Sequence, residues 1–239
     1  AAQTQALQDK INHLKTPFKV AYHTGLAELN NYFGMEYSVF FIILSFCLAS
    51  VYAKDSMNGI DELTLSSRHG RKKDMKARWI AGNLFTLTAY LIYVGVLMVV
   101  HGTIGSLHGL DASAQTFWFD CIFNISIGTG LLLIFFGGLA GALVIANIMM
   151  LLSMKIKNSK AAVVAGVVVI LLLRKGTGTY SQIKLLNPIR FGGSESAYHF
   201  LFVGTAIVPY FVLVLILSIV YVAALWLIMR LSYKKYYIN

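Results

Sequence analysis

The stretch "GLLLIFFGGLAGALVIANIMMLLSM", residues 130–154, contains no Asp, Glu, Lys, Arg or His. As an α-helix it would be long enough to cross the hydrocarbon layer of a membrane, which is roughly 30 Å thick. Three further blocks of at least 17 residues share this absence of charge: Tyr37–Ala53, Trp79–Val100 and Val203–Met229. Backbone polar groups in lipid must be paired internally, and these blocks lack the alternating pattern of barrel strands. We therefore expect them to be transmembrane helices.

The composition of the whole chain agrees with this class. Of its 239 residues 57% are hydrophobic and 13% are charged, whereas charged residues make up about a quarter of a soluble domain. A fifth block, Ala161–Leu173, is shorter. It would span only if Lys160 and Arg174 extend to the interface or if residues 176–180 continue the helix, and a re-entrant hairpin is the alternative. The predicted fold is an all-α integral membrane bundle with about five transmembrane helices, near residues 37–53, 79–100, 130–154, 161–180 and 203–229.

The distribution of Lys and Arg predicts the orientation of these helices. If the first span runs inward, thirteen basic residues lie in cytoplasmic segments and seven in outer ones. We therefore expect a multi-pass protein of the bacterial cytoplasmic membrane with an outer start and a cytoplasmic end. Basic flanks suit anionic lipid, so the pI near 9.6 is not interpreted as nucleic-acid binding.

Residues 1–36 are predicted to form an outer or interfacial helical segment that precedes the transmembrane domain, residues 37–239. We expect a helix over AQTQALQDKINHL, a break at Pro17, and a second helix over VAYHTGLAELNNYF near the headgroups. Nothing in this segment could carry it across a membrane. A cleaved signal sequence or, preferably, an earlier transmembrane helix is therefore expected before Ala1.

The predicted spans also lack acidic groups. All ten acidic residues fall outside them: Asp9, Glu28, Glu36, Asp55, Asp61, Glu62, Asp74, Asp111, Asp120 and Glu195. Ion-coupled carriers generally place ionisable groups at membrane depth, so a secondary transporter or a proton pump is disfavoured. The chain has no G-x-x-x-x-G-K-[ST] phosphate loop either. Energy for any uphill transport would have to come from a partner.

A polar stretch, "DELTLSSRHGRKKDMKARW" at residues 61–79, lies between the first two spans. The preceding Met57 and Ile60 fall with Leu63 on one arc of about 120° of a helix, whereas Leu65 lies off it. This pattern predicts a short amphipathic helix, ended by Gly70, that faces a cytoplasmic partner. An ordinary polar loop is the alternative. The basic run after it is expected to anchor the next span at the membrane interface through Lys72, Lys73, Lys76 and Arg78.

In this region the chain resembles the ABC-2-type permeases, the membrane subunits of ABC exporters whose ATPase is a separate chain. The resemblance consists of Asp55, then Gly59, "DELTLSS" at residues 61–67 and "SRHGRKK" at residues 67–73. These match the family's acidic residue after the second helix, its Gly, its short coupling helix and its Arg before the third helix. The segment "TPFKVAYHTGLAELNNYFGMEY" resembles the family's approach to its second helix, and the later spans fit the third to sixth helices. The chain departs from the family in lacking the first helix and in having Asp55 where Glu is more usual.

The resemblance implies that a cytoplasmic loop, residues 54–78, docks on a cytoplasmic ABC ATPase. That partner would bind ATP and Mg, and the chain itself would be neither catalytic nor cofactor-binding. The residues implied in ATPase coupling are Asp55, Met57, Gly59, Ile60, Asp61, Glu62, Leu63, Ser67, Arg68 and Arg71. The transport path would run between two permease subunits in a homodimer or heterodimer. Charge-free spans favour an amphipathic peptide, a peptide antibiotic or a lipid as cargo, and the alternative function is a non-transporting membrane scaffold or immunity protein that binds partners through its basic loop.

Four other features have two interpretations each. Gly137 and Gly141 form a G-x-x-x-G that suits either a dimer contact or close packing within the chain. Pro209 is expected to kink the last span, as a gate or as a fixed bend. The uncharged polar residues of the spans could line a path or join helices; they are Asn83, Thr86, Thr88, Tyr90 and Asn147. The outer loops contain potential zinc ligands or acid–base groups, but in no ligand motif, so solvated loop residues are the preferred interpretation over a membrane hydrolase; they are His101, His108, Asp111, Asp120, Glu195 and His199.

Overall fold

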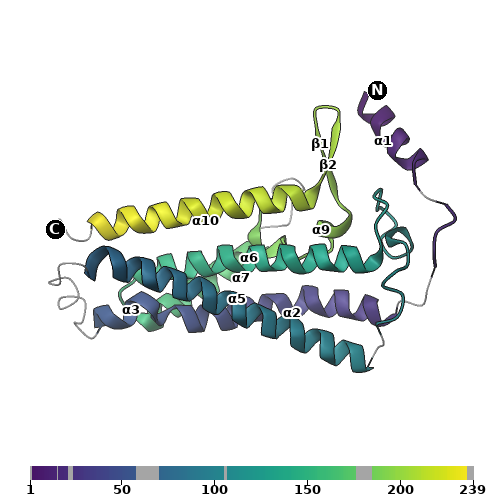
Figure 1. The fold of residues 1–239 in the computed structure, drawn as a ribbon. Helices are drawn as coiled ribbons and strands as arrows, with labels where there is room; N and C mark the ends of the chain where they lie inside the picture. Colours follow the sequence, from purple (N-terminus) through teal and green to yellow (C-terminus); the bar gives the residue numbers. More distant parts are fainter. Residues whose placement is uncertain are drawn as a thin grey trace.

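The computed structural model describes residues 2–14, 16–20, 24–57, 70–104, 107–175 and 185–235. Long helices lie side by side and form an elongated bundle (Figure 1). The helices of the bundle are α2 (Thr24–Leu48), α3 (Ser50–Met57), α5 (Gly70–Ile104), α6 (Ile127–Lys155), α7 (Ser159–Lys175) and α10 (Tyr210–Lys235). The other elements are α1 (Ala2–Asn12), η1 (Ala114–Thr116), η2 (Pro188–Arg190), α9 (Glu195–Tyr198), β1 (Phe200–Val203) and β2 (Ala206–Pro209).

Within the described residues, four helices are long and apolar enough to cross a membrane. Their candidate spans are Tyr37–Lys54, Lys73–Thr103, Ile127–Lys155 and Tyr210–Ser232. This confirms the prediction of a mostly helical chain with helices of membrane length. The fifth predicted span is represented by α7, which packs against α2 and α6 and has 17 residues. Its predicted continuation over residues 176–180 lies outside the described residues.

Helix α6 is at the centre of the bundle. It contacts α2, α3, α5, α7 and α10, and 61% of its most apolar window is buried inside the protein. The corresponding value for α10 is 11%, so most of the surface of α10 remains available to lipid. A helix that is apolar all round and packed on several sides is expected in the interior of a membrane bundle.

The G-x-x-x-G of α6 packs against a non-helical segment of the same chain, residues 185–194. A Cβ atom at Gly137 would collide with the carbonyl oxygen of Phe191, and one at Gly141 would collide with that of Pro188. Because Gly141 is the midpoint of α6, this segment enters the bundle to about half its depth. Of the two interpretations, close packing within the chain is therefore correct, and the re-entrant element lies after α7 rather than in the block 161–173.

The backbone of this re-entrant segment is satisfied by side chains around it. Asn187 donates from Nδ2 to the carbonyl of Leu173 at 2.6 Å and accepts from the amide of Ile189 at 3.0 Å. The hydroxyls of Tyr210 and Tyr221 donate to the carbonyls of Leu185 and Leu186 at 2.7 and 3.1 Å. Irregular backbone at membrane depth requires such partners, since lipid offers none.

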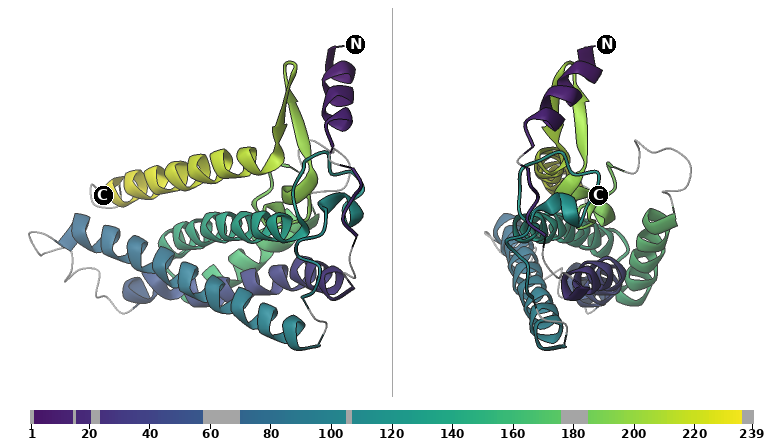
Figure 2. Two further views of the ribbon diagram at one scale, coloured as in Figure 1. Left: turned by 45° about the vertical axis from the view of Figure 1, so that its right-hand side comes forward. Right: turned by 90° about the vertical axis from the view of Figure 1, so that its right-hand side faces the viewer.

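The mostly helical structure is compatible with the predicted all-α class, but the prediction of a helix from Val203 is wrong. Residues 200–209 form an antiparallel hairpin in which Phe200 pairs with Pro209. Gly204 takes a positive φ of 65° at its turn, a conformation that suits glycine. Helix α10 begins at Tyr210, so Pro209 precedes the helix and the predicted kink does not exist. Figure 2 shows the hairpin projecting from one end of the bundle, next to α1.

The N-terminal part differs from the prediction in one respect. Helix α1 and the break around Pro17 are present, but the second predicted helix is the first part of α2 and is continuous with the first span. Leu26, Leu29 and Phe33 are buried on the same side of α2 as Tyr37. This apolar stripe at helical spacing continues the core across Gly34, which explains why the helix is not interrupted there.

Candidate functional site

The predicted ATPase-coupling residues that the structure describes, Asp55, Met57 and Arg71, lie at one end of the bundle, which we call the basic end. Here α3 ends, α5 begins and α6 gives way to α7 (Figure 1). Lys54, Lys155 and Arg230 are exposed at this end. The structure places Asp55 and Met57 in the last turn of α3 and Arg71 in the first turn of α5. The remaining predicted coupling residues lie outside the described residues; they are Gly59, Ile60, Asp61, Glu62, Leu63, Ser67 and Arg68.

The predicted loop 54–78 is shorter in the structure. Helix α3 extends to Met57 and α5 starts at Gly70, so the basic run forms the first turns of a long helix. Gly70 therefore begins a helix, and its predicted role at the end of one is wrong. Of the predicted interface residues, Lys73 and Lys76 are exposed and Arg78 is half-buried, whereas the side chain of Lys72 lies outside the description.

Ser153 of α6 joins the helix break between α2 and α3. Its hydroxyl donates to the carbonyl of Ala49 at 2.7 Å and accepts from the amides of Tyr52 at 3.0 Å and Ala53 at 3.1 Å. The Ser153 side chain is buried. A side chain inserted into the ladder of backbone hydrogen bonds is a common cause of a helix kink. Ser153 therefore fixes the inner part of the first span to α6.

Arg78 and Tyr52 join α3 to the start of α5. The guanidinium of Arg78 donates from Nε to Asp74 at 3.0 Å and from Nη1 to the carbonyl of Val51 at 2.9 Å. The Tyr52 hydroxyl donates to the carbonyl of Met75 at 3.1 Å, and the Arg78 guanidinium lies 5.8 Å from the centre of the Tyr52 ring. We call these contacts, together with those of Ser153, the inner clasp. It connects both borders of residues 58–69 to the central helix.

An apolar cluster extends the inner clasp to the last helix. Tyr52, Met75, Met150 and Met229 are buried together, one each from α3, α5, α6 and α10. Flexible methionine side chains fill irregular gaps of this kind and tolerate small displacements. The four helices at the basic end are thus packed as one unit.

A polar contact between α5 and α6 lies one turn deeper in the bundle. Trp79 donates from Nε1 to Asn147 Oδ1 at 2.5 Å, and Asn147 donates from Nδ2 to Asn83 Oδ1 at 2.9 Å. Nearer the other end of the same helices, Tyr90 donates to the carbonyl of Phe135 at 2.6 Å. Asn83, Tyr90 and Asn147 therefore join helices, which is the more common of the two roles considered for them.

Thr86 and Thr88 bond within their own helix. Their hydroxyls donate to the carbonyls of Gly82 and Leu84 at 2.8 and 3.0 Å. Both bonds run four residues back along α5, which satisfies a hydroxyl without a partner from another helix.

A wide apolar groove runs between α6 and α10, beginning near Trp79. Its volume is about 780 Å³, and its walls include Phe136, Leu143, Phe211 and Trp226. Apart from Ser218, every side chain that lines it is apolar or aromatic. Its outer rim is made by the lipid-exposed surface of α10.

The described residues contain no group of three or more His, Cys, Asp or Glu side chains that could hold a metal ion. Two of the six outer residues considered for such a site are ion-paired, Asp111 with Lys19 and Glu195 with Arg190. Cys47 of α2 and Cys121 of an outer loop are both free thiols.

Ser153 and Tyr52 were missed as functional candidates by sequence reasoning. Ser153 is an isolated hydroxyl in the run "MMLLSM", and Tyr52 lies near the charged end of the first block. A polar residue within an apolar span is the available signal, but it does not identify the helix that it contacts. In comparisons with known proteins, no protein-family model, curated protein or solved structure matches this chain.

Proposed function

We propose that this chain is the transmembrane permease subunit of an ATP-driven exporter of the ABC-2 type in the bacterial cytoplasmic membrane. A separate cytoplasmic ATPase would grip residues 58–69 and drive the movement. The observation that carries this proposal is the inner clasp, because it ties both borders of that segment to the central helix. The motifs from Asp55 to Lys73 supply the family resemblance.

The inner clasp offers a route for mechanical force. A displacement of residues 58–69 acts on α3 and α5, which flank the segment. The hydrogen bonds of Ser153 and Arg78 then pass it to α6 and to the turn between α2 and α3. Since α6 contacts α10, α2 and α7, these helices would move together as a rigid group. Such a group can switch a path between inward- and outward-open states.

The four candidate spans hold no acidic group at membrane depth with which to couple transport to an ion gradient. Asp74 is the one acidic residue within the four candidate spans, and it lies in the first turn of its span, bonded to Arg78 at 2.9 Å. Ion-coupled carriers depend on ionisable groups that bind and release ions at membrane depth. The energy is therefore proposed to come from ATP, hydrolysed with Mg by the partner ATPase.

The apolar groove between α6 and α10 supports the proposed cargo class. A second permease subunit, identical or related, would cover the exposed face of α10 and close this groove into a path. Its walls have no charged side chain. An amphipathic peptide, a peptide antibiotic or a lipid fits such walls better than a small ion.

The test uses the full chain, reconstituted with a candidate cytoplasmic ABC ATPase from the same cell. Replacing Ile60 by Asp should weaken ATPase association by on the order of tenfold and abolish stimulation of ATP hydrolysis, because an apolar docking contact is lost. Leu65→Asp is the matched control, since Leu65 lies off the predicted apolar stripe. Thermal unfolding of both variants should equal that of the unaltered chain.

Two outcomes would contradict the proposal. In one, the complex contains no ATPase in any nucleotide state, which favours the alternative of a non-transporting scaffold or immunity protein that binds through the basic end. In the other, Ile60→Asp and Leu65→Asp reduce association equally, so that no apolar stripe is recognised.

A further inference from the structure

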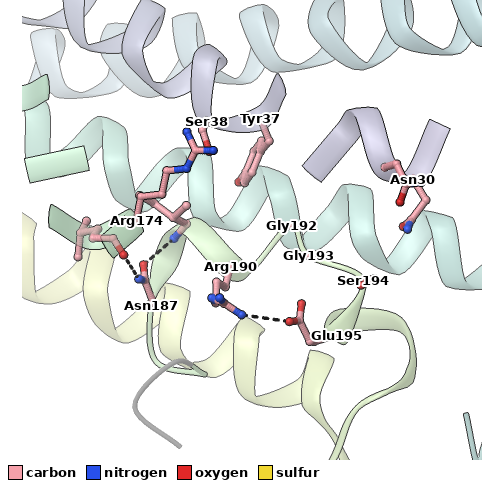
Figure 3. A pocket seen from close by; sticks show the side chains of 13 residues that line it. Asn30, Tyr37, Ser38, Arg174, Asn187, Arg190, Gly192, Gly193, Ser194 and Glu195 are labelled. Carbon is pink, nitrogen blue, oxygen red and sulfur yellow. Dashed lines mark hydrogen bonds and ion pairs between the residues drawn. The ribbon is translucent and has the colours of Figure 1, made fainter. Parts of the chain in front are cut away.

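A polar cavity lies at the end of the bundle opposite the basic end, which we call the hairpin end. Its volume is about 400 Å³, and it is enclosed by α2, the end of α7 and the re-entrant segment (Figure 3). Its polar lining includes Asn30, Asn31, Arg174, Asn187, Arg190 and Glu195. Two guanidinium groups and one carboxylate give this cavity a net positive charge.

The charged groups are held by different elements. Arg190 and Glu195 come from the re-entrant segment and the start of α9, and the guanidinium donates from Nη1 to the carboxylate at 3.2 Å. Their side chains are 36% and 31% exposed, so the pair is still open to a ligand in the cavity. Arg174 comes from the last turn of α7, and Asn187 is fixed by its bonds to Leu173 and Ile189. The cavity wall is thus built from rigid parts of the fold.

The cavity extends from the part of α2 that precedes the first candidate span into the bundle, where the re-entrant segment lies against α6. Tyr37 and Ser38, which line it, are the first residues of the first candidate span. Asn30 and Asn31 lie on the part of α2 that precedes this span. A ligand in the cavity would therefore extend from the hairpin end into the bundle.

A second cavity of about 400 Å³ adjoins the first and shares Asn30, Asn31 and Ser194 with it. Phe117, Trp118 and Tyr198 contribute aromatic walls. Because three residues line both cavities, they form one groove, which we call the outer groove. One part is polar and positively charged, and the other is aromatic.

Trp118 forms part of the aromatic wall of the outer groove. Its side chain is 7% exposed, and its Nε1 is buried with no hydrogen-bond partner among the described residues. The far edge of its six-membered ring faces Gly130 of α6, which places Nε1 at the other end of the ring. Because the Nε1 atom has almost no accessible surface, Trp118 contributes its ring rather than its N–H to the groove wall.

We propose that the outer groove binds the phosphoryl group of an anionic amphipath, with the phosphate between Arg174 and Arg190 and the adjoining ester region against Trp118. Two guanidinium groups from separate elements suit the several oxygens of a phosphate better than a single carboxylate. The amides of Asn30, Asn31 and Asn187 supply neutral donors around them. The aromatic walls suit the apolar part of a phospholipid such as phosphatidylglycerol. This site is independent of the proposed coupling to an ATPase.

The experiment measures ligand binding to the purified full chain in neutral detergent, by native mass spectrometry and by thermal shift. The probes are phosphatidylglycerol, phosphatidylcholine, which has no net charge, and water-soluble glycerol phosphate. We expect phosphatidylglycerol to bind more tightly than phosphatidylcholine. Arg174→Gln and Arg190→Gln should each weaken its binding by about tenfold, since each removes charge-assisted hydrogen bonds.

Three further variants test whether the weaker binding comes from unfolding of the chain or from non-specific attraction of the anionic ligand to positive charge. Arg230→Gln removes the same charge at the basic end, where Arg230 is exposed, and should leave binding unchanged. Arg174→Lys keeps the charge but loses the planar fork, so it should weaken binding less than Arg174→Gln does. Glu195→Gln removes the competing carboxylate and should tighten binding several-fold, an effect that a purely structural ion pair would not give.

The comparison of phosphatidylglycerol with glycerol phosphate identifies the source of the ligand. Binding of both phosphatidylglycerol and glycerol phosphate supports recognition of the phosphoryl group itself, and binding of phosphatidylglycerol alone supports a lipid ligand. The proposal is overturned if neither binds, if Arg230→Gln weakens binding as much as Arg174→Gln, or if Glu195→Gln fails to tighten it.

Discussion

At the residue scale, the hydroxyl of Ser153 has more consequence than any charge in the bundle core. One oxygen serves a carbonyl and two amides at the break between α2 and α3. These groups are buried in a water-poor environment, where an unpaired amide is costly. The stability of the inner clasp therefore depends on a single small side chain.

Replacing Ser153 by Ala should lower the free energy of unfolding by about 1–3 kcal/mol, because it leaves backbone amides unpaired. Thermal or denaturant unfolding in detergent measures this loss. Thr88→Ala is the matched control, since Thr88 is exposed and bonds within its own helix. An equal effect of the two substitutions would mean that Ser153 does not join the helices.

A second residue-scale prediction concerns the contact between Lys19 and Asp111 at the hairpin end. The hydrogen bond from Lys19, with its positive charge, holds the pKa of Asp111 below its ordinary value of 3.8. Because the pKa is lowered in the folded protein, the contact contributes stability at pH values above the ordinary pKa of Asp111. This contribution to stability is lost as the pH falls through the lowered pKa. Replacing Lys19 by Met should return the pKa of Asp111 toward its ordinary value, which carboxylate-selective NMR titration measures. An unchanged titration would show that the two residues do not pair in solution.

The residue scale is also where sequence reasoning was weakest. It selected Asp55 through the family resemblance and the basic residues through their position before an apolar block. The contacts of Ser153, Arg174 and Trp118 depend on neighbours from distant parts of the chain. No periodic pattern encodes such neighbours, so these residues could not be assigned a role from sequence.

At the element scale, the re-entrant segment determines how the helices are spaced. Its backbone lies against Gly137 and Gly141, where any larger residue would displace a carbonyl group. The small residues of α6 thus accommodate a non-helical neighbour of the same chain, and helices α2, α7 and α10 surround it.

Gly141→Ala should lower the free energy of unfolding by about 1–3 kcal/mol through overpacking against Pro188 and Tyr37. Gly95→Ala is the control, because a Cβ atom there would have no neighbour within 4 Å. That change should be neutral or stabilise by up to about 1 kcal/mol, as expected for Ala in a helix. Thermal unfolding measures the difference in stability between the two variants. Comparable stabilities would exclude close packing at Gly141.

Charge-free blocks predicted the helices well because lipid imposes both length and apolarity on a spanning helix. The same signal failed at residues 200–209. The strands "FLFV" and "AIVP" are as apolar as the helix that follows them, so hydropathy alone merges them into one block. Their β-branched and aromatic residues, followed by Pro209, were the signal that could have separated them.

At the scale of the whole molecule, the two ends of the bundle differ in chemistry. The basic end has exposed lysines and the borders of residues 58–69, packed to the central helix by the inner clasp. The hairpin end has the outer groove, with its two arginines, its carboxylate and its aromatic wall. Between them the spans have few ionisable groups. This division suits a passive subunit that is driven from one side and meets its amphipathic ligands within the membrane.

The measurement that tests this account most directly is site-specific photo-cross-linking from position 60 in intact membranes. A photoreactive residue in place of Ile60 should form an adduct with an ATP-hydrolysing subunit, and the yield should change when ATP is added. The same probe in place of Leu65 should give much less of this adduct. If position 60 gives no ATPase adduct in any nucleotide state, the chain is not driven through residues 58–69 and the proposed function is wrong.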